Sequence, residues 1–139
     1  MSETMSKTTS NTPAATSNSI LLIEDEPSVT AFVRAALERR GYSVVPAASG
    51  VEGLAQLAHG TFAGVISDIR MPGSMNGSEV HDWIRVHRPE LGQRVILMSG
   101  DTANSKTQAL LANSGIPFIE KPFRLEQLIS VVESTFGKP

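Results

Sequence analysis

Short apolar runs that each end in polar or charged residues constrain the fold of this chain most strongly. Four of them, at 20–23, 63–68, 94–98 and 116–119, lead directly into charged or turn-forming residues. Runs of this length between turn residues are typical of strands buried on both faces of a parallel sheet. A fifth run at 42–47 is less apolar, and we expect it nearer the edge of the sheet.

Segments with apolar residues at helical spacing separate the predicted strands. Pro27 suits the first turn of one helix, and the Ser49–Glu52 and Asn76–Glu79 pairs fit capping boxes of two others. We expect Val51 and Ala58 to face inward from the second helix. Five helices are expected, beginning near residues 27, 49, 76, 103 and 124. Strands that alternate with helices predict a doubly wound (βα)5 domain of the α/β class, with a five-stranded parallel sheet covered on both faces.

Composition excludes several classes of function. The 12 basic and 14 acidic residues give a net charge of -2, so no nucleic-acid partner is expected. The chain has no cysteine, which excludes disulfides and cysteine-based metal sites. No run is long enough for a membrane span or a signal peptide, so we expect a cytoplasmic protein with no membrane partner. No glycine-rich phosphate loop opens the first helix, so nucleotide binding has no support.

Two segments differ in their capacity to fold. Residues 1–18 are rich in Ser, Thr, Asn and Ala and hold few large apolar side chains, so we expect a disordered leader. Residues 19–137 hold the predicted strands and helices and form one domain. The three histidines, His59, His81 and His87, have no ligand spacing to one another or to acids, and we expect them at the surface.

Chemically useful side chains follow the four most apolar strands. Glu24 and Asp25 follow the first, Asp68 ends the second, and Ser99 and Lys121 follow the last two. The carboxyl ends of parallel strands meet at one edge of a sheet, so these groups are expected to converge. Three carboxylates in a partly buried site repel one another unless a cation compensates them. A hard divalent ion such as Mg²⁺ fits that need.

This set of groups suits phosphoryl transfer. A carboxylate can attack phosphorus and hold the phosphoryl group as an acyl phosphate. Mg²⁺, an ammonium group and a hydroxyl donor stabilise the charge that spreads over the phosphoryl oxygens in the transition state. Asp68 is the expected nucleophile because it stands alone at its strand end, whereas Glu24 and Asp25 are paired for the metal.

Four motifs in order along the chain resemble the receiver domain of bacterial two-component response regulators, which has a flavodoxin-like fold. The resemblance covers about residues 19–137. Its motifs are Glu24-Asp25-Glu26-Pro27, Asp68-Ile69-Arg70-Met71-Pro72-Gly73, Met98-Ser99-Gly100 and Lys121-Pro122-Phe123. The sequence departs from the family in having Glu24 where the family most often has Asp, and in a loop at 73–77 that is one residue longer than the commonest form.

The resemblance implies a role for each matching position. Asp68 would be the phospho-acceptor and a metal ligand, and Asp25 a direct Mg²⁺ ligand. Glu24 would act on the metal through water, and the backbone carbonyl of Arg70 would complete the coordination. The longer arm of Glu24 is expected to shift metal affinity.

Other positions would bind the phosphoryl group or change conformation when it is present. Ser99 would donate a hydrogen bond to it, and Lys121 would pair with it. The Lys121–Pro122 peptide bond is expected to be cis. Phe118 matches the aromatic residue that switches together with Ser99. Positions that tune dephosphorylation correspond to the following residues: Arg70, Gly100 and Asp101.

The resemblance implies a stand-alone response regulator receiver that accepts a phosphoryl group from a histidine kinase or phosphotransfer protein and then changes its binding to a partner protein. The expected partner surface is built from the fourth helix, the last strand and the last helix, in a monomer or a phosphorylation-dependent dimer. It implies no enzyme activity beyond phosphorylation from a donor and autodephosphorylation. Two alternatives stay open: a phosphorylation-independent pseudo-receiver, and the receiver piece of a hybrid histidine kinase. A hydrolase with an aspartyl intermediate is disfavoured, because such enzymes usually carry a second acid where this chain has Arg70.

Overall fold

The computed structural model describes residues 18–70, 75–100, 109 and 115–138. Residues 1–17 of the expected leader, nearly all of the expected helix at 103–113, and Asp101 therefore lie outside the described residues. The elements run in this order: β1 (Ser19–Ile23), α1 (Pro27–Glu38), β2 (Ser43–Ala47), α2 (Gly50–His59), β3 (Gly64–Asp68), α3 (Gly77–His87), the 3-10 turn η2 (Pro89–Leu91), β4 (Val95–Ser99), β5 (Phe118–Glu120) and α5 (Leu125–Phe136).

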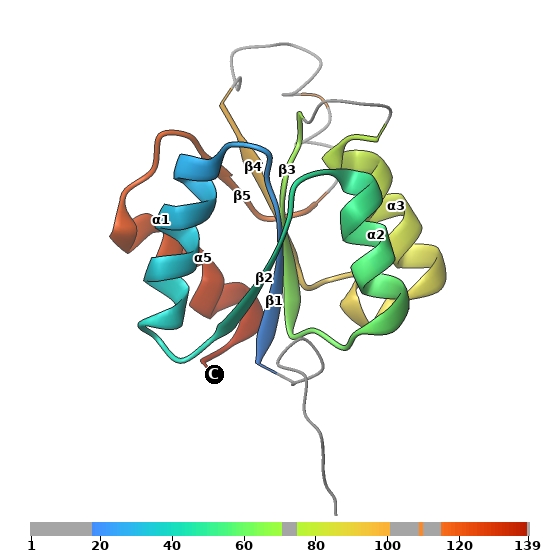
Figure 1. Cartoon of the computed structure of the whole chain (residues 1–139), viewed down its shortest axis with the longest axis horizontal. Coiled ribbons are helices and arrows are strands. Elements are labelled where there is room, and N and C mark those ends of the chain that lie inside the picture. Colours follow the sequence, from blue (N-terminus) through green and yellow to red (C-terminus); the bar gives the residue numbers. More distant parts are fainter. Residues whose placement is uncertain (1–17, 71–74, 101–108, 110–114, 139) are drawn as a thin grey trace, which may run out of the picture.

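The five strands form one parallel sheet in the order β2-β1-β3-β4-β5. Helices α1 and α5 cover one face, and α2 and α3 cover the other (Figure 1). The expectation of a doubly wound α/β domain is confirmed, and β2 is an edge strand as predicted. Within the described residues, no helix is both long and apolar enough to cross a membrane.

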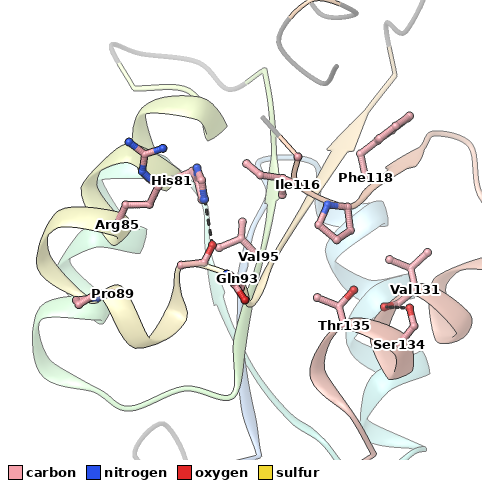
Figure 2. Close-up of a pocket in the computed structure, with 13 residues that line it drawn as sticks. His81, Arg85, Pro89, Gln93, Val95, Ile116, Phe118, Val131, Ser134 and Thr135 are labelled. Atoms are coloured by element: carbon pink, nitrogen blue, oxygen red, sulfur yellow. Dashed lines mark hydrogen bonds between the residues drawn. The ribbon is translucent and has the colours of Figure 1, made fainter. Parts of the chain in front are cut away.

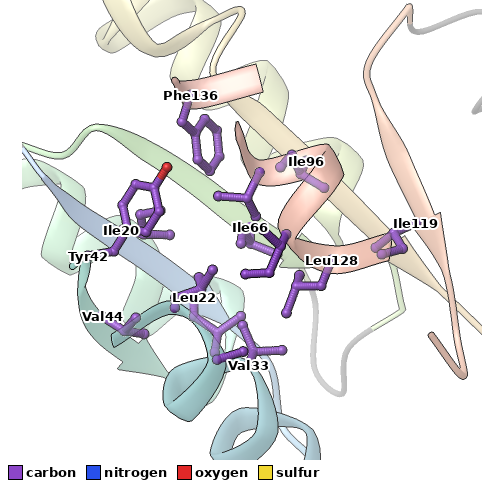
Figure 3. Packing of buried hydrophobic residues seen from close by; sticks show 14 of the residues in the cluster. Ile20, Leu22, Val33, Tyr42, Val44, Ile66, Ile96, Ile119, Leu128 and Phe136 are labelled. Atoms are coloured by element: carbon purple, nitrogen blue, oxygen red, sulfur yellow. The ribbon is translucent and has the colours of Figure 1, made fainter. Parts of the chain in front are cut away.

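The core consists of two apolar layers, one on each side of the sheet. Alternate residues of β1 point to opposite faces, so Ile20 and Leu22 pack under α1 and α5, and Leu21 and Ile23 pack under α2 and α3. Figure 3 shows the first layer, in which Phe136 closes one end. Every residue of β1, β3 and β4 is buried, as the near-continuous apolar runs predicted.

Two predicted capping arrangements begin helices on the side of α2 and α3. Asn76 caps α3 with a complete capping box: its side chain accepts from the backbone N–H of Glu79 (2.9 Å), whose carboxylate accepts from the N–H of Asn76 (3.0 Å). Ser49 caps α2 by accepting from the N–H of Glu52 (3.1 Å), although the Glu52 carboxylate accepts from Ala48, one residue earlier than a capping box requires.

The inward face of α2 differs from the prediction. We expected Val51 and Ala58 to face inward, but both are exposed, Val51 by 63%. Gly50 and Gly53 are buried instead. A Cβ atom on Gly53 would lie 2.4 Å from the side chain of Ile23, so the missing side chain is what lets α2 approach β1 closely.

His81 also contradicts the prediction, because it is only 7% exposed. It shares the inward face of α3 with Val80 and Ile84. Its Nε2 atom lies 3.2 Å from the carbonyl oxygen of Gly92, which accepts a hydrogen bond and satisfies the buried ring. His59 and His87 are exposed as expected.

Candidate functional site

The candidate site lies at the carboxyl edge of the sheet. Glu24 and Asp25 directly follow β1, and Asp68 is the last residue of β3. Carboxylate oxygens of these three residues all lie within 4.8 Å of one another. Glu24 and Asp68 are buried, at 3% and 6% exposure, whereas Asp25 is exposed. The convergence that the strand ends predicted is therefore present.

Lys121 directly follows β5 and is the cation of this acidic cluster. Its Nζ atom lies 2.8 Å from Glu24 Oε1 and 2.9 Å from Asp68 Oδ2. A third carboxylate, that of Glu26, lies 3.3 Å from the same Nζ. The backbone N–H of Lys121 donates to the carbonyl of Ser99 (2.8 Å), so the residue is tied to the end of β4.

Asp68 is held by the strand below it and by the turn above it. The N–H of Ile69 donates to the carbonyl of Met98 (2.9 Å), which extends the pairing of β3 with β4 past the strand end. The N–H of Arg70 donates to Asp68 Oδ1 (3.2 Å) while Oδ2 receives Lys121. One carboxylate oxygen thus faces a backbone donor and the other faces an ammonium group.

Gly77 brings the first turn of α3 against this strand end. A Cβ atom at this position would lie 2.7 Å from the carbonyl oxygen of Asp68 and 3.0 Å from the Cα atom of Ile69. The N–H of Gly77 donates to the carbonyl of Ile69 (3.0 Å). A residue with a side chain does not fit here without moving the backbone that carries Asp68.

Burial and pairing raise the pKa values of both Glu24 and Lys121. The shift favours the neutral form of Glu24 and the charged form of Lys121. Burial raises the pKa of Glu24 above its ordinary value, although the hydrogen bond with Lys121 opposes that shift. Burial lowers the pKa of Lys121, but the bonds to Asp68 and Glu24 outweigh it, so its pKa lies above the ordinary value. Lys121 therefore stays charged at neutral pH, and the cluster keeps an excess of negative charge.

The donor set of the cluster suits a hard divalent cation. Carboxylate oxygens are the ligands that Mg²⁺ prefers, and three of them converge here from Glu24, Asp25 and Asp68. The buried Glu24 Oε1 lies 2.8 Å from the ammonium of Lys121, its partner among the described residues. A carboxylate oxygen has more than one lone pair, so the Glu24 side chain can also interact with a bound cation.

The other predicted site residues are placed as follows. Ser99 ends β4 and is buried, with 1% exposure. Gly100 and Arg70 are exposed at the same edge, and the Lys121–Pro122 bond is cis, as expected. Phe118 is 44% exposed on β5 and lies at the rim of a groove that α3, β4 and α5 also line, with its ring directed away from the other labelled residues (Figure 2).

Sequence reasoning missed Glu26. It lies in the first motif, but no role was assigned to it, and its contact with Lys121 joins residues 95 positions apart. Its place beside Glu24 and Asp25 at a strand end was the available signal.

Comparisons with known proteins agree with this geometry. The sequence model of the response regulator receiver domain matches residues 20–133. Over 124 residues the chain is 36% identical to the sensor kinase CckA of Brucella abortus, covering 88% of this chain and 13% of that protein. The chain thus spans a small part of that relative.

Solved structures show the same fold. A CheY-like receiver domain protein from Methanospirillum hungatei superposes with a TM-score of 0.77 at 26% identity, covering 87% of this chain and 94% of that one. The receiver domain of a sensor histidine kinase from Pseudomonas aeruginosa, described with a magnesium ion in its active-site cleft, has a TM-score of 0.75 at 23% identity, covering 88% and 100%. This chain belongs to the family of response regulator receiver domains of two-component systems.

Proposed function

We propose that residues 19–137 form a receiver that accepts a phosphoryl group on Asp68, with Mg²⁺, from a histidine kinase or phosphotransfer protein in the cytoplasm. The observation that carries this proposal is the setting of Asp68, whose carboxylate lies between the Lys121 ammonium (2.9 Å) and the Arg70 N–H (3.2 Å) within a cluster of acids. The proposal concerns the receiver itself, and it applies to a separate chain and to part of a longer protein alike.

The proposed step transfers a phosphoryl group from an atom of the donor to a carboxylate oxygen of Asp68. A carboxylate oxygen of Asp68 attacks phosphorus and forms an O–P bond while the bond from phosphorus to the donor breaks. With a phosphohistidine donor the electron pair returns to the imidazole nitrogen, and the products are an acyl phosphate and free histidine. The Lys121 ammonium would neutralise charge on the phosphoryl oxygens, and Ser99, the last residue of β4, would donate its hydroxyl to one of them.

Three side chains and one backbone group are proposed to hold Mg²⁺. Asp25 and Asp68 would bind it directly, the carbonyl of Arg70 would be the third direct protein ligand, and Glu24 would act through water. Carboxylate oxygens of the three acids lie within 4.8 Å of one another. The related receiver from Pseudomonas aeruginosa, described with magnesium in its cleft, supports this choice of ion. When bound, the ion would neutralise charge that develops on the transferring group.

The output of the proposed switch is a change in partner binding at β5 and α5. A shallow groove runs between these elements at the edge of the sheet, lined by Phe118, Glu120 and Val131 among others. Phe118 is exposed there, and Ser99 pairs in register with Glu120, so both proposed switch residues adjoin this edge. The predicted helix at 103–113 would complete the surface, in a monomer or a phosphorylation-dependent dimer. Coupling requires that the phosphoryl group favour one arrangement of Ser99 and Phe118 over another.

Arg70 is proposed to tune the lifetime of the phosphoryl group together with Asp101. Arg70 is exposed and lies two residues beyond Asp68, the last residue of β3. A long cationic side chain at that position can pair across the mouth of the site and hinder the attacking water. The Arg70→Ala variant is expected to lose its phosphoryl group faster than the wild type, and an unchanged decay rate contradicts this role.

Intact-mass measurement after incubation with acetyl phosphate and Mg²⁺ tests the proposed function. The wild type is expected to gain one phosphoryl group, which hydroxylamine removes because it cleaves acyl phosphates. Asp68→Ala should gain none, and Asp82→Ala should behave as the wild type, because Asp82 is an exposed acid on α3. Equal gain by the wild type and Asp68→Ala excludes Asp68 as the acceptor. No gain by the wild type favours a binding module that works without phosphorylation.

A further inference from the structure

Glu26 has an exposed carboxylate that is nevertheless directed toward the buried site. Its side chain is 59% exposed, yet Oε1 lies 3.3 Å from the Nζ atom of Lys121. Glu26 is also the N-cap residue of α1, but its side chain makes no capping hydrogen bond. The carboxylate is therefore directed at the lysine, and the usual interaction of an N-cap side chain is absent.

The backbone of Glu26 is fixed on both sides. Its N–H donates to Glu24 Oε2 (3.0 Å), and its carbonyl accepts from the N–H groups of Val29 and Thr30 (3.1 Å each). These bonds anchor the residue to the acidic cluster and to the first turn of α1. Little freedom remains except in the side chain, which reaches Lys121 from the solvent side.

Three carboxylates surround the ammonium group of Lys121, which has three N–H donors. The distances from Nζ are 2.8 Å to Glu24, 2.9 Å to Asp68 and 3.3 Å to Glu26. A phosphoryl oxygen that binds this ammonium group must therefore replace one of them. The Glu26 contact is the longest of the three, and its carboxylate is the most exposed, so water can solvate it fully once it is displaced.

We propose that Glu26 is a positioning residue that holds Lys121 at the mouth of the site until a phosphoryl oxygen takes its place. This inference rests on the proposed function. It predicts opposite effects of the Glu26 charge on the rate of phosphoryl transfer and on the affinity for Mg²⁺. A negative charge beside the site repels an incoming phosphoryl group and attracts a divalent cation, so removing the charge should speed phosphoryl transfer and weaken Mg²⁺ binding.

The test uses Glu26→Gln with acetyl phosphate as donor. In this reaction an Asp68 oxygen forms a bond to phosphorus, and the bond from phosphorus to the acetate oxygen breaks, so acetate leaves with the electron pair. At saturating Mg²⁺, the initial rate from intact mass should rise about threefold to tenfold for one charge removed at this range. The Kd of Mg²⁺, measured by calorimetry without any phosphodonor, should rise by a similar factor.

Two further variants serve as controls. One keeps the charge at residue 26 but changes the length of the side chain, and the other changes the net charge of the protein at a distant position. Glu26→Asp keeps the charge and should return both quantities toward those of the wild type. Asp82→Asn removes an equal charge from an exposed position on α3, and it should leave both quantities unchanged. High salt should reduce the rate increase of Glu26→Gln, because salt screens exposed charges.

The outcomes distinguish this inference from the proposed function. If the wild type takes up a phosphoryl group and Glu26→Gln does so at the same or a lower rate, the inference is overturned and the proposed function stands. If Glu26→Gln binds Mg²⁺ as tightly as the wild type, the electrostatic basis is wrong. If the wild type takes up no phosphoryl group, both are overturned.

Discussion

Replacing Lys121 by methionine is expected to destabilise the metal-free protein by removing the counterion of a buried acidic cluster. The side chains involved are 15% exposed for Lys121, 0% for Glu24 and 9% for Asp68. Breaking a buried ion pair by removing one partner costs about 3–5 kcal/mol, and the open mouth of this site reduces that figure to about 2–4 kcal/mol. Methionine keeps much of the apolar stem of lysine, so the decrease in the free energy of unfolding measures the effect of removing the charge.

Mg²⁺ and acid should each relieve that loss. In the variant the cation no longer competes with an ammonium group, so saturating Mg²⁺ should reduce the deficit to about 1 kcal/mol or less through preferential binding to the folded state. Burial raises the pKa of Glu24 and the hydrogen bond with Lys121 opposes that shift, so without Lys121 the folded variant binds a proton there more tightly than the folded wild type does. The deficit should therefore shrink as the pH falls from about 7 toward about 5.

Urea denaturation followed by circular dichroism measures these quantities in EDTA and in Mg²⁺. Lys138→Met is the matched control, because Lys138 is exposed near the end of the described chain, and its free energy of unfolding should equal that of the wild type. An equal deficit for Lys121→Met in EDTA and in Mg²⁺ would refute the reasoning. A variant more stable than the wild type in EDTA would do the same, because it would mean that the lysine is not needed to compensate the acids.

Three further changes test the fold. A Cβ atom on Gly64 would lie 2.3 Å from the Phe136 ring, so Gly64→Ala should lower the free energy of unfolding in urea by about 1–3 kcal/mol, whereas Gly100→Ala, whose nearest contact is 3.8 Å, should not. Asn76→Ala removes the α3 capping box and should cost about 1 kcal/mol in the same assay; an unchanged midpoint contradicts that role. Burial raises the pKa of Tyr42, whose hydroxyl donates to the carbonyl of Gly137. The wild type should therefore lose stability above about pH 10, and a Tyr42→Phe variant that loses as much would show that Tyr42 is not the source.

The sheet could be predicted from the sequence because its inner strands are buried on both faces. Burial on both faces requires apolar residues at successive positions, and that pattern is visible as continuous runs. The capping residues Ser49 and Asn76 were visible for a similar reason, since a cap depends on side chains only three residues apart. Both signals are local in the chain.

The orientation of α2 could not be predicted because its inward face is marked by small residues. Helical spacing of large apolar side chains assigned Val51 to the core, but Gly50 and Gly53 face inward and allow close packing. His81 shows the complementary error, since its polar ring was assigned to the surface although it lies one turn from Ile84 on the inward face. In both cases the position on the helix decides burial, and the chemistry of the side chain does not.

The candidate site was predictable in its members but not in its contacts. Parallel strands bring their carboxyl ends together whatever the intervening sequence, so Asp25, Asp68 and Lys121 could be expected to converge. The contact between Glu26 and Lys121 depends on the turn after β1 and on side-chain direction, neither of which the strand pattern fixes. The contact between Glu26 and Lys121 could therefore be found only from the structure.

Lys121 connects the charge of the site to the edge of the sheet. Its ammonium group contacts three acids, and its backbone N–H is bonded to the carbonyl of Ser99. Under the proposed function, phosphorylation replaces a carboxylate by a group of greater negative charge, so the ammonium group is drawn toward it. Because Lys121 directly follows β5, a movement of its backbone would be carried by the chain into the strand that presents Phe118. A partner bound at β5 and α5 would therefore sense the phosphoryl group through the same residue that neutralises it.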